Sequence, residues 1–393
     1  MKFTKEHITI LIVQITEVLG FSLILPFLPF YAQEFGANPL QIGLILSSFS
    51  FFQFLSAPVW GKLSDKYGRR PLLIFSQLST FVSFVILAFS NSLEMIFFSR
   101  ILDGILGSNF TIAQAYLSDI SSKEDRSKAF GISGVAFGIG FLIGPGVGGF
   151  LSQFGYQIPS FIAAAMSFLT TLIIFVFLPE TVEKREDIEI SLKTFHVESF
   201  KKFFSDPEIS SKLWEFFSYI SAFSIWVGSF ALYAQKKLGL GSEGIGYILT
   251  YIGFISIIIR GVLLSKIIDA FGEHRLRYAG MASIFLGMIG SVLATHWFWM
   301  IVIMTLFSFG SGILRPVMIG SISRSAPEDQ QGAALGVANS LVSIAQIIGP
   351  LLGGFMINYF VPESLGLLSG AIILIGAGLM LSEDRRKDHR TNP

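Results

Sequence analysis

Twelve long apolar runs follow one another along this chain of 393 residues, and each is about long enough to cross a lipid bilayer. A helix needs about 20 mostly apolar residues to span a hydrocarbon core about 30 Å thick. Backbone groups in that core must bond within the protein, and unbroken apolar runs favour helices over alternating barrel strands. We therefore predict an all-α membrane protein with 12 transmembrane helices. The predicted spans cover residues 8–31, 40–60, 72–90, 95–118, 128–152, 158–178, 212–235, 243–265, 277–295, 298–322, 331–357 and 362–382.

The composition excludes most other classes of protein. Hydrophobic residues make up 52% of the chain and charged residues only 14%, whereas a soluble domain carries about a quarter charged residues. Because the net charge is only +1, no nucleic acid is expected as a partner. The chain has no Cys and five scattered His, and it lacks nucleotide-binding and metalloprotease motifs. We therefore expect no metal site and no enzyme.

The distribution of Lys and Arg predicts the orientation in the membrane. Of the 28 Lys and Arg residues, Lys236 and Lys237 fall on the side opposite to the termini, and Arg100, Arg260 and Arg315 fall inside spans. All the others fall on the side of the termini, which is the bias of cytoplasmic loops. We predict a multi-pass protein of the inner or plasma membrane with both termini cytoplasmic, and a first span that is retained rather than cleaved.

The longest polar stretch separates six predicted spans from six. We predict an N-terminal six-helix bundle, a cytoplasmic linker, and a C-terminal six-helix bundle with a short cytoplasmic tail, at residues 1–178, 179–211 and 212–393. Parallel halves joined by a central cytoplasmic loop are typical of alternating-access transporters, whose substrate site lies between the halves.

The two halves repeat each other in sequence. Residues 129–150 in span 5 match residues 334–355 in span 11 at a constant offset of 205, sharing a Gly-Pro-x-x-Gly-Gly pattern. Residues 65–68 match residues 269–272 at an offset of 204. The two residues that follow are both Arg in the first half but Glu and His in the second.

Residues 61–71 read Gly-Lys-Leu-Ser-Asp-Lys-Tyr-Gly-Arg-Arg-Pro. This segment resembles the loop 2–3 signature of the major facilitator superfamily nearly residue for residue, and the chain resembles that superfamily over essentially its whole length. Residues 25–31 are similar to its 12-span drug:proton antiporter branch. Span 4 carries Arg100-x-x-x-Gly104, similar to a membrane-embedded Arg motif, with Asp103 where the family usually has Gln. The resemblance implies the major facilitator fold of two pseudo-symmetric six-helix bundles.

The loop signature predicts a conformational gate. A carboxylate at Asp65 could sit against the N-terminus of another span, and the resemblance implies span 11. Arg69 and Arg70 could bridge to a carboxylate such as Asp119. The alternative is a basic loop that only fixes topology. The predicted gate consists of Gly61, Asp65, Gly68, Arg69, Arg70 and Asp119.

Span 5 carries a stripe of small residues, Gly140, Gly144, Gly148 and Gly149, interrupted by Pro145. Small residues let two helices approach closely, and proline bends a helix because it lacks an N–H. The pattern is similar to the span-5 motif of proton-coupled antiporters, where the resemblance implies packing that suppresses leak. Ordinary tight packing would produce the same pattern.

Two acids are predicted to serve proton coupling. Glu17 lies about 14 Å into span 1, near the bilayer centre, where a charge is costly. Desolvation disfavours the charged carboxylate, so Glu17 could take up and release a proton. Asp103 lies at a similar depth in span 4. If Arg100 pairs with Asp103, Glu17 is the better proton carrier, whereas if Arg100 pairs with Glu17, the role moves to Asp103. A protonated Glu17 that only bonds a neighbouring helix is the structural alternative.

Polar and aromatic residues on spans 1, 4, 7 and 10 predict the substrate cavity, because the resemblance places these spans around it. Aromatic rings with few charges suit amphipathic or cationic organic molecules. Interhelical hydrogen bonds and lipid contacts would explain the same residues. The predicted cavity residues are Gln14, Phe27, Tyr31, Asn109, Gln114, Tyr219, Trp226 and Arg315.

These features predict a monomeric, proton-coupled antiporter that exports amphipathic or lipophilic molecules by alternating access. The proton gradient would drive it, so no cofactor is expected. One alternative is a proton symporter or facilitator that imports a small metabolite. Another is a membrane receptor on the same fold that does not transport.

Overall fold

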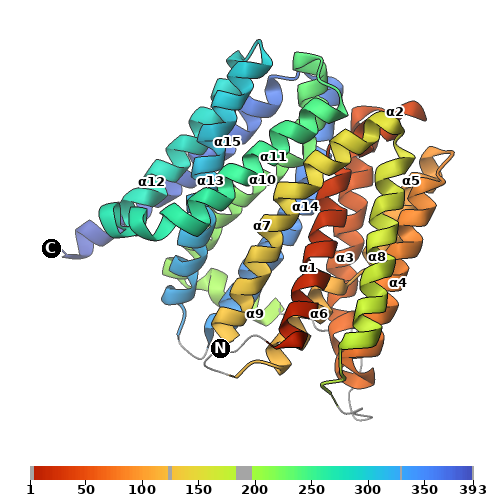
Figure 1. Cartoon of the computed structure of the whole chain (residues 1–393). Coiled ribbons are helices and arrows are strands. Elements are labelled where there is room, and N and C mark those ends of the chain that lie inside the picture. The colour runs from red at the N-terminus through yellow and green to blue at the C-terminus, as the bar shows by residue number, and fades with distance from the viewer. Residues whose placement is uncertain (1–3, 123–125, 183–196, 328–329, 392–393) are drawn as a thin grey trace. The chain divides into compact units, whose positions relative to one another are not determined.

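The computed structural model describes residues 4–122, 126–182, 197–327 and 330–391. These residues form helices joined by short loops, with no strand among them (Figure 1). The helices are α1 (Lys5–Ile24), α2 (Leu28–Glu34), α3 (Pro39–Tyr67), α4 (Arg69–Ala88), α5 (Leu93–Leu106), α6 (Asn109–Asp119), α7 (Arg126–Leu151), η1 (Ser152–Phe154), α8 (Gln157–Phe177), α9 (Val197–Ser205), α10 (Pro207–Leu238), α11 (Ser242–Ile258), the π-helical turn η3 (Ile259–Leu263), α12 (Leu264–Leu293), α13 (Trp297–Ser325), α14 (Gln331–Tyr359) and α15 (Ser364–Thr391).

All twelve predicted runs lie on helices, and the all-α membrane fold is confirmed. Two runs are interrupted where the sequence disfavours a continuous helix. Pro26 and Pro29 lie where α1 gives way to α2, since proline cannot donate the helical hydrogen bond. Gly107 and Ser108 separate α5 from α6, so the fourth run consists of two short helices.

Ten helices in the described part of the chain are long and apolar enough to cross a membrane. The number is below twelve for two reasons. The helices α5 and α6 have only 14 and 11 residues. The eighth and ninth runs lie in one continuous helical segment of 52 residues, from Ser242 to Leu293. That segment is bent at Gly272, whose φ of 74° is reached easily only by glycine.

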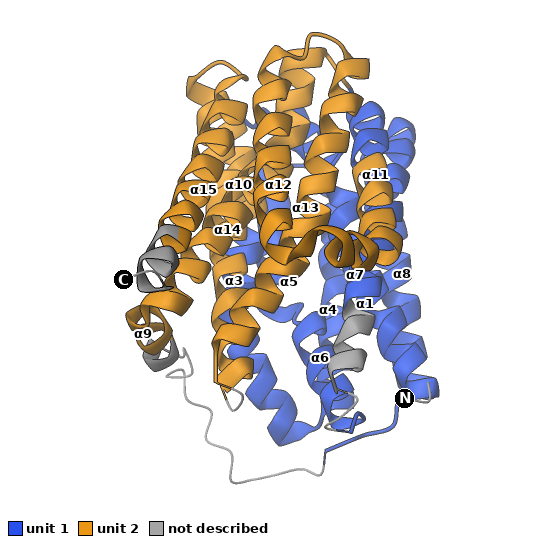
Figure 2. Ribbon diagram, turned by 90° about the vertical axis from the view of Figure 1, so that its left-hand side faces the viewer, with its two compact units in different colours: residues 1–38, 48–195, 241–250 blue, residues 39–47, 196–240, 251–393 orange. Residues whose placement is uncertain are grey.

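The chain divides into two compact units (Figure 2). The first comprises residues 1–38, 48–195 and 241–250, and α1 packs there against α7, α8 and α6. The second comprises residues 39–47, 196–240 and 251–393, and α10 packs there against α14 and α15.

Helix α9 and the start of α10 lie within the predicted linker. Asp206 begins α10, because its carboxylate accepts a hydrogen bond of 2.9 Å from the backbone N–H of Glu208. Part of the predicted linker, residues 183–196, lies outside the described residues. The predicted three-part division of the chain stays a prediction.

Close glycine contacts join α1 to α7 in the first unit. A methyl group added at Gly140 would meet the side chain of Val18, and one at Gly148 would overlap the carbonyl of Leu23. The Ser22 hydroxyl donates a hydrogen bond of 2.8 Å to the Gly140 carbonyl. Three of the predicted glycines, Gly140, Gly144 and Gly148, therefore bring α7 against α1 rather than leaving a free stripe.

Gly149 and Pro145 contact a different helix. A methyl group at Gly149 would lie 3.0 Å from the Cα of Gly246 on α11, and one at Gly246 would lie 2.5 Å from the Pro145 carbonyl. The repeat is retained in the second unit, where a methyl group at Gly354 would lie 3.2 Å from the Cα of Gly43, near the start of α3. Each unit therefore includes a short helix end from the other half of the sequence, held by glycine packing.

Replacing Gly148 with alanine is expected to destabilise the protein by about 1–3 kcal/mol, because the new methyl group has no room against the Leu23 backbone. Gly134 on the same helix provides a matched control, since it is exposed and has nothing within 4 Å of the added methyl. Gly134→Ala should leave the melting temperature unchanged or raise it. Thermal unfolding in detergent measures both variants, and equal melting temperatures would contradict the packing assigned to Gly148.

Candidate functional site

A buried polar chain begins at the carboxyl group of Glu17 on α1. The side-chain amide of Asn109 donates a hydrogen bond of 2.8 Å from Nδ2 to Oε2 of Glu17. Asn109 is the first residue of α6, directly after the break at Gly107 and Ser108. The interruption of the fourth run therefore presents this amide to α1.

The chain continues through α4 to α5. Nδ2 of Asn109 also donates to Oγ1 of Thr80, at 3.0 Å. The Thr80 hydroxyl in turn bonds the carboxylate of Asp103. Glu17 and Asp103 are thus joined through two neutral side chains that can each accept or donate a hydrogen bond.

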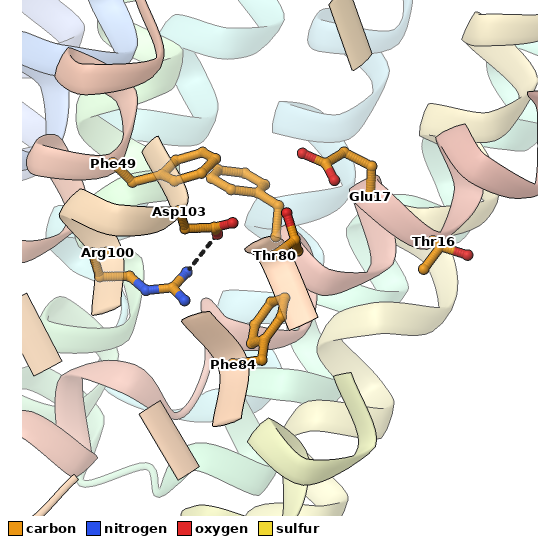
Figure 3. Close-up of a pocket in the computed structure, with 8 residues that line it drawn as sticks. Thr16, Glu17, Phe49, Thr80, Phe84, Arg100 and Asp103 are labelled. Atoms are coloured by element: carbon orange, nitrogen blue, oxygen red, sulfur yellow. Dashed lines mark ion pairs between the residues drawn. The ribbon is translucent and has the colours of Figure 1, made fainter. Parts of the chain in front are cut away.

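Arg100 completes the chain by pairing with Asp103. Its Nη1 lies 3.4 Å from Oδ2 of Asp103, one helical turn away on α5 (Figure 3). Both residues are buried. The guanidinium also lies over the ring of Phe84, 5.1 Å from its centre. Of the two pairings left open by the sequence, the structure contains the one between Arg100 and Asp103.

Glu17, Thr80, Asp103 and Arg100 line one pocket in the first unit (Figure 3). Its charged wall is the Arg100–Asp103 pair and the Glu17 carboxyl, which is half-buried. Its apolar wall is formed by phenylalanines, with the rings of Phe21 and Phe49 6.0 Å apart. The full lining consists of Thr16, Glu17, Phe21, Phe49, Thr80, Phe84, Arg100 and Asp103.

The other predicted cavity residues of spans 1 and 4 lie in different surroundings. Phe27 and Tyr31 are fully buried, and the Tyr31 hydroxyl donates to the Ser90 carbonyl at 2.8 Å. Gln14 is also fully buried. Gln114 lies on α6 and is half-buried. None of these four lines the Glu17 pocket, although Asn109 from the same predicted set reaches it.

Tyr219, Trp226 and Arg315 lie in the second unit. Tyr219 and Trp226 are buried in α10, and the Tyr219 hydroxyl lies 3.4 Å from the carbonyl of Ser311. Arg315 is half-buried on α13. Their place in a substrate cavity stays a prediction.

Arg69 is the centre of the predicted gate. Its Nε donates to Oδ2 of Asp119 at 3.0 Å, and its Nη2 forms an ion pair with Asp65. Nη1 donates to the Ser64 hydroxyl at 2.6 Å and lies 3.4 Å from the carbonyl of Gly61. The structure thus brings four of the six predicted gate residues into one cluster.

Glu180, which was not predicted from the sequence, completes this cluster. Its carboxylate accepts hydrogen bonds from the backbone N–H groups of Arg69 and Arg70, at 2.8 and 3.1 Å. It therefore caps the start of α4, where a negative charge is favoured. Gly68 has a φ of 102°, and a methyl group there would lie 2.5 Å from the Glu180 carboxylate. Arg70 turns away and donates to the Phe175 carbonyl.

The second half contains the corresponding ion pair with its charges exchanged. At the repeat offset of 204, Arg69 corresponds to Glu273, and at the offset of 205, Asp119 corresponds to Arg324. Glu273 and Arg324 form an ion pair. His274 takes the place of Arg70, and its Nε2 lies 3.4 Å from Oδ2 of Asp384. The substitutions in the second loop therefore preserve the contact rather than removing it.

Comparisons with known proteins agree with this fold. A family model described as Major Facilitator Superfamily matches residues 10–297 and 289–393. The chain is 32% identical to the tetracycline resistance protein, class H, of Pasteurella multocida, covering 94% of each chain. It is 28% identical to multidrug resistance protein 2 of Bacillus subtilis (strain 168), covering 98% of each.

Two solved structures share the fold at lower identity. The human organic anion transporter MFSD10 has a TM-score of 0.70 at 22% identity, covering 96% of this chain and 99% of that one. A bacterial homologue of the human lysosomal transporter Spinster has a TM-score of 0.73 at 14% identity, covering 97% and 96%.

Reversing the charge of Arg69 should destabilise the protein, and reversing Asp119 as well should restore it. Arg69→Glu places a carboxylate beside Asp65 and Asp119, at an expected cost of about 3 kcal/mol. Arg69→Glu with Asp119→Arg reproduces the arrangement of Glu273 and Arg324. Melting temperatures of the two single variants and the double variant measure this coupling. If the double variant loses as much stability as the two single variants together, the exchanged-charge relationship is refuted.

Proposed function

The chain belongs to the major facilitator superfamily, and on that premise we propose that it is a proton-coupled antiporter that exports small amphipathic or lipophilic molecules. Its family and fold make it a transporter rather than an enzyme. The observation that carries the proposal is the buried chain from Glu17 through Asn109 and Thr80 to Asp103.

Glu17 is the proposed proton carrier. A carboxyl group in this pocket is costly in its charged form unless a neighbouring group compensates the charge. Arg100 lies within 3.4 Å of Asp103, so that acid already has a cation to offset its charge. Among the described residues, the hydrogen bond to Glu17 comes from the neutral amide of Asn109. Losing its proton therefore leaves Glu17 with a charge beside a neutral partner, whereas the charge of Asp103 is offset by Arg100. The protonation state thus matters more for the stability of Glu17 in the pocket.

Asn109 and Thr80 are proposed to link the two acids. When Glu17 loses its proton, the amide of Asn109 can strengthen its bond to the carboxylate, since bonds to charged groups are the stronger ones. The same nitrogen bonds Thr80, which bonds Asp103. A change of charge at Glu17 is thus transmitted to the Arg100–Asp103 pair without a proton having to travel between the acids.

The exchange cycle follows from this arrangement. Glu17 would take a proton from the outer side while the pocket is accessible there, and would release it to the cytoplasm as substrate is taken up. The Arg69 cluster at the start of α4 would hold the cytoplasmic ends of the first unit in one arrangement, as the gate of the cycle. In the structure Asp65 pairs with Arg69, and its predicted contact with span 11 stays a prediction.

The substrate class is proposed from the pocket and from the relatives. Three phenylalanine rings, Phe21, Phe49 and Phe84, line the pocket together with Glu17 and the Arg100–Asp103 ion pair. Aromatic walls and an acid outside that ion pair suit a lipophilic molecule that carries a positive charge. The curated relatives are tetracycline and multidrug resistance proteins, and we extend that substrate class to this chain.

The chain is a multi-pass membrane protein. We propose that it resides in the inner or plasma membrane as a monomer, with both termini in the cytoplasm. This orientation rests on the Lys and Arg distribution. The proton gradient would supply the energy, without a cofactor.

Glu17→Gln should reduce proton-driven export by about a hundredfold, because the amide cannot exchange a proton. The assay uses inverted membrane vesicles, an imposed proton gradient and a panel of cationic and neutral lipophiles. Glu34→Gln is the matched control, since Glu34 is an exposed acid at the end of α2. Export by Glu17→Gln at the wild-type rate across the pH range would eliminate Glu17 as the carrier.

Asp103→Asn should lower the stability of the protein but leave the pH dependence of export in place. The variant leaves Arg100 buried without its anionic partner, so a loss of about 3–5 kcal/mol in unfolding free energy is expected. The export that remains should still depend on the pH of the cytoplasmic side, because Glu17 is intact. Melting curves and vesicle transport at several pH values test both statements. Residual export that no longer responds to pH would transfer the carrier role to Asp103.

A further inference from the structure

Two buried glutamines, Gln14 on α1 and Gln77 on α4, have no protein partner for their amide groups among the described residues. Both side chains are fully buried, with an exposed fraction of 0%. The oxygen and the nitrogen of each amide lack a hydrogen bond within the described part of the chain. Four buried polar atoms of the first unit therefore have no hydrogen-bond partner among the described residues.

Side chains of α1 and α4 come together at several levels, and these levels lie on both sides of the two glutamines. At one level, a methyl group on Gly20 would lie 3.1 Å from the ring of Phe84. At a second level, one nitrogen of Asn109 bonds both Glu17 and Thr80. Contacts of this kind at successive levels keep the two helix faces in register.

A third level, an apolar cluster shared by α1 and α4, lies beyond the glutamines on the side away from Glu17. Val13 on α1 and Leu73 on α4 belong to one buried apolar cluster with Ile112 of α6. Gln14 follows Val13 and precedes Glu17 by one turn, and Gln77 lies one turn before Thr80. Residues three apart share a helix face. From this spacing we expect both amides to project between the acid and this apolar cluster.

Leaving these amides unbonded would be costly. An amide taken from water without a new hydrogen bond costs about 1–3 kcal/mol in proteins, and buried polar groups in native proteins almost always find a partner. The two polar side chains of the apolar cluster, Trp60 and Tyr116, bond the carbonyls of Ile105 and Pro179 instead. A small molecule that can both donate and accept, namely water, satisfies both ends of a primary amide.

We propose that Gln14 and Gln77 form an internal water site directly adjoining Glu17, and that this water stabilises the Glu17 carboxylate after its proton has left. The second clause rests on the proposed function, whereas the water site does not. The glutamines are thus positioning residues for the proton step, which act on Glu17 through water. Their role differs from the substrate contact predicted for Gln14 from the sequence.

The charged groups around this site are few. Asp103 and Arg100 on α5 face Glu17 across the pocket. Helix α8 and the described side chains of α7 carry no charged residue, and those of α4 and α6 lie at their ends, at Arg69, Arg70 and Asp119. Tyr116 on α6 bonds the carbonyl of Pro179 through its hydroxyl. Within the described residues Asn109 bonds the Glu17 carboxyl, and bound water is the second group that we propose to solvate it.

X-ray radiolytic labelling of the purified protein tests the water site directly. Radicals formed from bound water modify the nearest side chains even when these are inaccessible to bulk solvent. Leu73 and Leu87 are both fully buried on α4, but Leu73 adjoins the site and Leu87 lies about 15 Å from it along the helix. We expect labelling of Leu73 and not of Leu87, and loss of the Leu73 label in the Gln14→Met, Gln77→Met double variant. No label on Leu73 in the wild type, or an unchanged label in the double variant, would overturn the proposal.

The effect on Glu17 is tested by the internal pH dependence of export. Loss of one hydrogen bond to a carboxylate should move the pH of half-maximal export upward by about one unit, because proton release becomes harder. Ser83→Ala on α4 is the control, since Ser83 is buried but bonds the Ser79 carbonyl of its own helix. An unmoved pH profile in the double variant would refute the positioning role. Wild-type export that ignores pH would instead refute the proposed function and leave the labelling result standing.

Discussion

The hydrogen bond between Asn109 and Glu17 is the contact on which the proposed mechanism depends. A carboxyl group in the middle of an apolar bundle is costly in its charged form and requires polar neighbours in either form. Asn109 supplies one of them, and the same nitrogen extends the connection to Thr80. Moving Asn109 by one helical position would break both bonds, so the interruption between α5 and α6 is part of the site rather than an irregularity beside it.

The rest of the first unit keeps this contact in place from two directions. Glycines on α7 let α1 approach so closely that side chains on α7 would collide with its backbone. At the other end of α4, Arg69 and Glu180 tie the start of the helix to the ends of α6 and α8. The helix that carries Glu17 is therefore restrained along its C-terminal half, and the helix that carries Thr80 is restrained at its start. A change of charge at Glu17 is then expected to alter these contacts between helices, and not only the side chains next to the acid.

The sequence predicts the fold well because the bilayer leaves few solutions for twelve apolar runs. It also predicts Glu17, Asp103 and Arg69, since a charge in an apolar run or a dense motif stands out. Thr80 and Glu180 could not be predicted in this way. Thr80 is one of many hydroxyl residues in the spans, and Glu180 lies just beyond an apolar run, where a charge is ordinary. Their importance comes from partners about 30 and 110 residues away, which only the folded chain brings together.

Proton release on substrate binding is the most direct test of the central claim, that the charge of Glu17 changes as substrate binds. Purified protein in weakly buffered detergent solution, mixed with tetracycline or a lipophilic cation, should release protons that a pH indicator detects. The account predicts release by the wild type and none by Glu17→Gln, over a range where both bind the compound. Substrate binding by the wild type without any proton release, or equal release by both proteins, would contradict it.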